Sequence, residues 1–133
     1  MAITDRNGLP VALRIERASP AEVNLVDDLI EHRLTKSKPT ILLGDKAYDS
    51  DALDARLAKQ GIEMVAPNKS NRIIPTQDGR KLRRYKRRWR VERAFAWLNN
   101  FRRTVTRWEM YSFNFRGFLQ TACMSILARS FLR

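Results

Sequence analysis

Cysteine, histidine and long apolar runs are the features that this 133-residue chain almost lacks. Cys123 is its one cysteine, which excludes an internal disulfide and a cysteine-based zinc cluster. Because Cys123 stands in an apolar helical pattern, we expect a core thiol in a reducing compartment. His32 is the one histidine, which argues against a metal site built on histidines. No apolar run is long enough to span a bilayer, and the start MAITDRNGLP does not resemble a secretory signal.

Acidic residues are scarce in one part of the chain. Residues 80–107 contain 12 Lys or Arg and a single carboxylate, Glu92, whereas the other 105 residues hold 14 basic and 13 acidic side chains. The net charge of +12 therefore lies almost wholly in one element, which is typical of a protein that binds a phosphate backbone. An anionic membrane is the alternative partner, but the basic block does not separate a lipid-facing side from a charged side.

Hydrophobic periodicity and turn residues predict an α/β protein whose sheet contains strands of both directions. We expect one domain over 1–133, with a hairpin and βαβ part at 1–79 and two helices at 80–133. The predicted elements, in chain order, are hairpin strands at 2–4 and 11–15, a helix that starts with Ser19-Pro20-Ala21-Glu22, a strand at 41–43, a helix from 51 that is closed by Gly61, a strand at 62–66, a polar loop at 67–79, a long basic helix near 81–103 and a last helix near 113–132.

Two carboxylates are the candidates for chemistry. Asp45 follows a predicted strand after Gly44, at the strand end where the functional crevices of open α/β sheets lie, although a turn or capping aspartate is the alternative. On one continuous helix, Tyr85, Arg88 and Glu92 would share a stripe that is separate from the apolar face. An ion pair with Arg88 is one explanation of Glu92. The other is a divalent cation held with Asp45, which would remove the repulsion between a lone carboxylate and DNA phosphates.

The motifs GDKAYDS at 44–50 and YKRRWRVERAFAWLNNFRRTVTRWE at 85–109 together resemble the DDE transposases of bacterial insertion sequences, in the insertion-sequence-four/five superfamily. The hairpin TDRNGLPVAL and the segment ASPAEVNLVDDLIE add to the likeness, which covers nearly the whole chain. The resemblance implies a ribonuclease-H-like fold, a mixed sheet with flanking helices. It also implies DNA strand cleavage and strand transfer by an Asp, Asp, Glu triad that holds two metal ions, Mg²⁺ or Mn²⁺.

The motifs carry the family's functional residues onto positions of this chain. Asp45 matches the second aspartate of the triad and Glu92 matches its glutamate, so both are predicted metal ligands and catalytic residues. The family signature is Tyr-x2-Arg-x3-Glu-x6-Lys, and Asn99 stands where it has lysine, with two arginines one turn further on. The predicted DNA-binding residues are Tyr85, Lys86, Arg87, Arg88, Arg102 and Arg103.

The first aspartate of the family's triad lies on a strand upstream of the hairpin turn, and Asp5 matches a turn residue instead. We therefore expect a truncated transposase, or the downstream frame of a split gene, that lacks the strand between 2–4 and 41–45 and is inactive alone. The implied partners are double-stranded DNA, at element ends and target, and further copies of the chain in the active complex. The implied location is the bacterial cytoplasm, at the nucleoid.

Two other functions remain open from the sequence. One is a non-catalytic basic DNA-binding fragment that modulates a full-length transposase, which predicts salt-sensitive binding without metal-dependent cutting. The other is an RNA-binding protein, a reading that depends on charge alone and leaves GDKAYDS unexplained.

Overall fold

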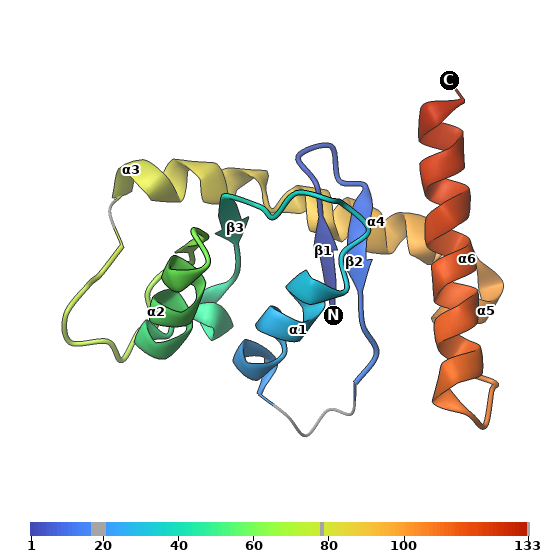
Figure 1. The fold of residues 1–133 in the computed structure, drawn as a ribbon, viewed down its shortest axis with the longest axis horizontal. Helices are drawn as coiled ribbons and strands as arrows, with labels where there is room; N and C mark the ends of the chain where they lie inside the picture. Colours follow the sequence, from blue (N-terminus) through green and yellow to red (C-terminus); the bar gives the residue numbers. More distant parts are fainter. Residues whose placement is uncertain (17–20, 78, 133) are drawn as a thin grey trace. The chain divides into compact units, whose positions relative to one another are not determined.

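The computed structural model describes residues 1–16, 21–77 and 79–132, which form a mixed α/β protein of small sheets and helices (Figure 1). The predicted cap Ser19 and the following Pro20 lie outside the described residues. The chain divides into two compact units. The hairpin unit comprises Met1–Arg17, His32–Leu34 and Trp89–Arg133, and the crossover unit comprises Ala18–Glu31 and Thr35–Arg88.

Both predicted strand directions are present, in two separate two-stranded sheets. β1 (Ala2–Thr4) pairs antiparallel with β2 (Pro10–Leu13), and β3 (Ile41–Leu43) pairs parallel with β4 (Glu63–Val65). Within the described residues the four strands do not form the one mixed sheet that was expected. Each strand of three or four residues hydrogen-bonds only to one neighbour, and the resemblance itself predicted a further strand between β1 and β3.

The turn of the β1–β2 hairpin is closed by Asp5. Its Oδ1 accepts hydrogen bonds from the backbone N–H groups of Asn7 and Leu9, both at 2.8 Å. Gly8 has a φ of 80°, and a Cβ there would also lie 2.9 Å from Nη2 of Arg93. The predicted turn and the turn role of Asp5 are therefore confirmed.

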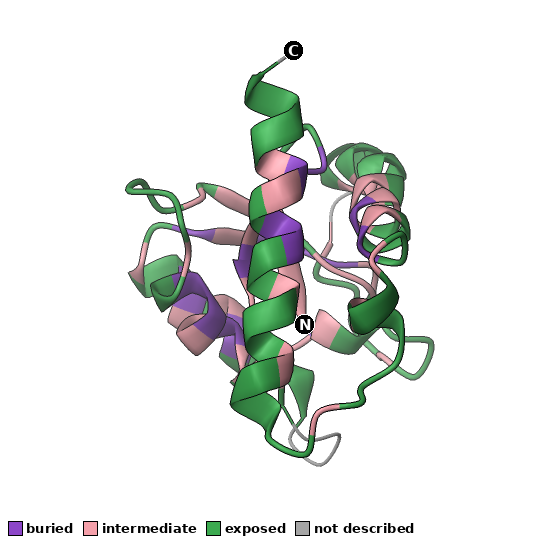
Figure 2. Cartoon of the chain, turned by 90° about the vertical axis from the view of Figure 1, so that its right-hand side faces the viewer, coloured by how far each residue is buried: buried purple, intermediate pink, exposed green. Residues whose placement is uncertain are grey.

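Two helices supply the rest of the core of the hairpin unit, α4 (Trp89–Leu98) and α6 (Ser112–Phe131). The buried cluster consists of Leu9, Leu98, Ala122, Cys123 and Ile126. Cys123 is thus the predicted core thiol, and its burial raises the pKa of the thiol. Figure 2 shows that burial on α6 is confined to the middle of the helix. Phe131, at the end of α6, is 79% exposed.

The basic segment is not the one long helix that was predicted near 81–103. It is divided into α3 (Gly79–Leu82), the 3-10 helix η3 (Arg83–Arg87), α4 and α5 (Arg102–Val105). Like charges three and four residues apart destabilise an α-helix, and residues 83–88 contain no acidic residue to offset them. Only the residues of α4 share an α-helical face, so the predicted stripe through Tyr85, Arg88 and Glu92 is not continuous.

The crossover unit contains the predicted βαβ arrangement, β3, α2 (Asp51–Lys59) and β4. Ser50 caps α2, because its Oγ accepts from the N–H of Leu53 at 3.4 Å, and Gly61 follows the helix with a φ of 73°. Two short helices precede this arrangement, η1 (Glu22–Asn24) and α1 (Val26–Glu31). The most deeply buried side chains are Leu29, Ile30, Leu53, Leu57, Ile62 and Val65. None of the helices in the described ranges combines the length and apolarity of a bilayer span.

Candidate functional site

Asp45 lies directly beyond β3 and caps a short 3-10 helix, η2 (Lys46–Tyr48). Its Oδ1 accepts from the N–H of Ala47 at 2.9 Å, so the capping role that was the alternative for this residue is real. The side chain remains 40% exposed. Capping therefore leaves Oδ2 of Asp45 accessible to another ligand.

Arg88 is the cationic neighbour of Asp45. Its Nη2 lies 4.0 Å from Oδ2 of Asp45, and its Nη1 donates to the hydroxyl of Tyr85 at 2.8 Å. The guanidinium carbon also lies 5.8 Å from the centre of the Tyr85 ring. Three predicted site residues from two motifs are thus brought together within the crossover unit. Both charged side chains are about two-fifths exposed, so the pair contributes little to stability.

Glu92 belongs to the hairpin unit, where it is exposed in the first turn of α4. The partial positive charge at a helix N-terminus favours a carboxylate there, which is one physical reason for a lone acid in this basic segment. Because Asp45 lies in the other unit, a cation held by both carboxylates stays a prediction.

The donor chemistry of the two carboxylates fits Mg²⁺ or Mn²⁺, since hard cations prefer carboxylate oxygens. A complete set of protein ligands is not assembled in the described ranges, where no group of three or more His, Cys, Asp or Glu side chains could hold a metal ion. Asp45 and Glu92 are therefore candidate ligands by their chemistry, without a complete ligand set in the described ranges.

The predicted phosphate-binding residues divide into two kinds. Lys86 and Arg87 in η3 and Arg102 in α5 are exposed. Arg103 is itself 60% exposed, but it donates from Nη1 to Oε1 of Glu109 at 2.9 Å, and its guanidinium carbon lies 4.9 Å from the centre of the Phe118 ring. Arg103 thus has a role inside the hairpin unit that the sequence did not indicate.

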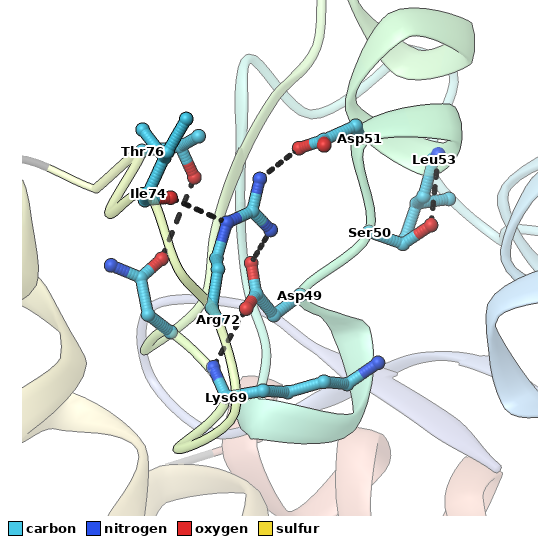
Figure 3. Close-up of polar contacts among 9 residues, drawn as sticks. Asp49, Ser50, Asp51, Leu53, Lys69, Arg72, Ile74 and Thr76 are labelled. Carbon is cyan, nitrogen blue, oxygen red and sulfur yellow. Dashed lines mark hydrogen bonds and ion pairs between the residues drawn. The ribbon is translucent and has the colours of Figure 1, made fainter.

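The sequence reasoning also missed a buried carboxylate beside the candidate site, Asp49 (Figure 3). Its Oδ2 accepts from the N–H of Lys69 at 2.7 Å, and its Oδ1 accepts from Nη1 of Arg72 at 2.6 Å. Nη2 of Arg72 donates to Asp51 on the other side. No role was predicted from the sequence for Asp49 or for Arg72, which is one of three charged residues in the loop at 67–79.

Tyr48 anchors the same turn to η1. Its hydroxyl donates to Oε2 of Glu22 at 2.8 Å. Burial raises the pKa of Tyr48, and the hydrogen bond to Glu22 raises it further. Glu22, which the sequence placed only in a predicted helix start, therefore binds a tyrosine of the candidate site.

Comparison with known proteins links these motifs to one family. The family described as transposase DDE domain matches residues 1–127. A protein assigned as the transposase for insertion sequence element IS402 of Burkholderia cepacia is 32% identical over 134 residues. The match covers 93% of this chain and 59% of that relative, so the chain spans less than two thirds of the relative's length. No solved structure matches the chain.

Proposed function

This chain belongs to the transposase DDE domain family, and from that premise we propose that it works in DNA transposition as part of the catalytic domain of an insertion-sequence transposase. In the proposed reaction, water attacks a phosphodiester at the element's end and releases a 3′-hydroxyl. That hydroxyl then forms a new bond to a phosphorus of the target DNA, and a target 3′-oxygen leaves. The proposal includes a ribonuclease-H-like catalytic core whose remaining strands come from the rest of the transposase.

The observation that supports this function best is the set of contacts around Asp45. A half-exposed carboxylate stands at the carboxyl end of a parallel strand, which is where α/β proteins bind their ligands. Arg88 and Tyr85, from the second motif, adjoin it. In the proposed site Arg88 exchanges its weak contact with Asp45 for a DNA phosphate, which a guanidinium binds with two parallel hydrogen bonds.

Asp45 and Glu92 are the proposed ligands of a divalent cation, Mg²⁺ or Mn²⁺. When bound, such a cation supplies Lewis-acid stabilisation of the charge that develops on phosphate oxygens. The residues of this chain hold it and orient the scissile phosphate. The third acidic ligand is proposed to come from another segment of the assembled transposase, because the chain matches only part of its relative.

Lys86, Arg87 and Arg102 are the proposed contacts to the DNA backbone, because their exposed charges are free of the packing role that occupies Arg103. Phosphate contacts position a protein on the duplex without reading its sequence. Recognition of the element's ends would therefore depend on other parts of the transposase. A chromosomal substrate would put the site of action at the bacterial nucleoid, in a complex of several copies.

The test combines this chain with the remaining part of an insertion-sequence transposase, in trans or as a fusion, and measures nicking of DNA that carries the element's ends. Cleavage is expected only with Mg²⁺ or Mn²⁺, and it should be abolished by Asp45→Asn and by Glu92→Gln. Glu31→Gln, which removes an exposed carboxylate outside both motifs, is the matched control and should leave cleavage intact.

Two outcomes would overturn the proposed reaction. One is cleavage that survives both substitutions. The other is salt-sensitive DNA binding with no metal-dependent cutting in any complemented form, which would establish the basic DNA-binding module instead.

A further inference from the structure

The turn that carries Asp45 is very short, so its two ends cannot move independently. Asp45 precedes η2 and Asp49 follows it, and two backbone hydrogen bonds span the turn, from the N–H of Tyr48 to the carbonyl of Asp45 at 3.1 Å and from the N–H of Asp49 to the carbonyl of Lys46 at 3.3 Å. Fixing the side chain of Asp49 therefore restrains the backbone from which the Asp45 carboxylate projects.

Asp49 is fixed by the loop that follows β4. Its side chain is 1% exposed, and both carboxylate oxygens are used, one by the N–H of Lys69 and one by Nη1 of Arg72. Arg72 makes two more bonds, from Nη2 to Asp51 and from Nε to the carbonyl of Ile74 at 3.0 Å. Figure 3 shows the guanidinium between the two aspartates. One arginine thus ties the loop to residues on both sides of Ser50.

The loop exposes apolar side chains while this arginine points inward. Ile73 is 94% exposed and Ile74 is 74% exposed, whereas Arg72 is only 16% exposed. A flexible loop that followed hydrophobicity alone would turn the isoleucines in and the arginine out. The inverted arrangement is the one that the bonds of Arg72 to Asp49 and Asp51 favour.

We propose that Asp49 and Arg72 are positioning residues that hold the Asp45 carboxylate in its ligand-binding orientation, an inference that rests on the proposed function of Asp45. Arg72 acts through Asp49, and Asp49 acts through η2. Tyr48 adds a second restraint in the middle of the turn through its bond to Glu22. The conformation of a catalytic turn is thereby coupled to a loop about 25 residues further along the chain.

The first measurement needs no catalysis. Backbone ¹⁵N order parameters of Asp45, Ala47 and Tyr48 are compared between the unmodified chain and Arg72→Gln. We expect values above about 0.8 in the unmodified chain and below about 0.6 in the variant, the range of flexible backbone. The amides of β3 and β4 should keep their rigidity in both.

A second variant guards against simple unfolding, because Arg72→Gln leaves a buried carboxylate without its cation. Asp49→Asn combined with Arg72→Gln removes both charges, so no buried carboxylate is left without a cation. Asn has the shape of Asp, and Gln is a shorter, neutral side chain in place of Arg72. The double variant should fold and still show a flexible turn at 45–48, since two neutral amides bind each other more weakly than a charged fork.

Ile62→Val is the control. Ile62 is 2% exposed in the core of the crossover unit, and its apolar side chain takes no part in the polar contacts of Asp45, Tyr48 and Asp49. It should lower stability without any loss of order at 45–48. This separates local positioning from a general loss of stability.

The second measurement uses the complemented transposase. Arg72→Gln is expected to raise the Mn²⁺ concentration for half-maximal cleavage about tenfold, the equivalent of one charged hydrogen bond, with unchanged affinity for DNA. Ile62→Val should not alter the Mn²⁺ requirement.

The two measurements test the positioning role and the proposed reaction independently. If residues 45–48 stay as ordered in both Arg72 variants as in the unmodified chain, the positioning role is wrong whatever the enzyme does. If the turn loosens as expected but the unmodified, complemented protein cuts no DNA, the positioning role stands and the proposed reaction is wrong.

Discussion

Nη2 of Arg88 lies 4.0 Å from Oδ2 of Asp45, so a candidate phosphate-binding cation and a candidate metal ligand are neighbours within one unit. Both side chains are substantially exposed, and solvent screens an attraction at that distance. The contact is therefore weak enough to be exchanged for a ligand.

Substitution of Arg88 should thus affect binding more than stability. Arg88→Gln is expected to lower the unfolding free energy by less than about 1 kcal/mol. The loss of one phosphate contact should reduce the slope of log K against log salt by about 0.9. Denaturant unfolding and DNA-binding titrations at several salt concentrations test both values. Arg14→Gln is the control, because Arg14 and Glu16 form an exposed pair at 3.0 Å outside the basic segment. A core-like destabilisation by Arg88→Gln would contradict this view.

Arg102 and Arg103 are adjacent, yet we expect opposite effects from their removal. Glu109 is 8% exposed, and its Oε2 is buried without a hydrogen-bond partner in the described ranges, so Arg103 is its compensating charge. Arg103→Ala should destabilise the protein by about 1–3 kcal/mol. Arg102→Ala should weaken DNA binding with little change in stability. Equal stability of the two variants would mean that the Arg103–Glu109 pair is not formed in solution.

Tyr48 should make stability depend on pH in the alkaline range. Burial and Glu22 raise its folded-state pKa above the ordinary value of 10.0. The unfolded chain then loses the hydroxyl proton first, so the contribution of Tyr48 is fully present below pH 10.0 and is lost as the pH rises above it.

Tyr48→Phe should lower stability at pH 7 by about 1–2 kcal/mol, the contribution of a hydrogen bond to a charged group in a partly exposed site. It should also flatten the alkaline decline, which denaturant titrations between neutral pH and alkaline pH would measure. Tyr111→Phe changes an exposed tyrosine and serves as the control. An unaltered pH profile in Tyr48→Phe would exclude the proposed cause.

Gly44 has a steric role rather than a conformational one. A Cβ at this position would overlap the terminal methyl of Met64 and lie 2.9 Å from Cδ2 of Tyr48. Gly44→Ala is therefore expected to displace Tyr48 and to destabilise the protein by about 1–3 kcal/mol. A Cβ added at Gly117 in α6 would have no described atom within 4 Å beyond its own stretch of helix. Gly117→Ala should therefore stabilise the protein by about 0.5–1 kcal/mol. Thermal unfolding of both variants checks the contrast, and stabilisation by Gly44→Ala would refute it.

Local features of the fold could be predicted from the sequence with good accuracy. The Asn7-Gly8 turn, the parallel pairing of Ile41–Leu43 with the strand after Gly61, and the position of α6 were all predicted and are confirmed. The prediction of one long basic helix was wrong. It rested on apolar periodicity and left out the repulsion among the cations of Arg83–Arg87.

The candidate site divides in the same way. Motif spacing selected Asp45 and Glu92 as candidates, and in the structure Arg88 lies beside Asp45 and bonds to Tyr85. The roles of these residues, and a cation shared by Asp45 and Glu92, stay predictions. The contact between Asp49 and Arg72 was not predicted, because the two residues are 23 positions apart and no motif or spacing links them.

The sequence by itself determined the local chemistry of this protein. It has an α/β pattern, a charge that is nearly balanced outside one strongly basic segment, two candidate carboxylates in transposase-like motifs, and a single core thiol. These properties follow from residue types and short spacings. Only the tertiary structure decided which charges are paired. Arg103 is paired with Glu109 and Arg72 with Asp49, whereas Lys86 and Arg87 have no carboxylate partner among the described residues. The physical reason is that the strength of a charge pair depends on burial and distance, and both are set by packing between segments far apart in the chain.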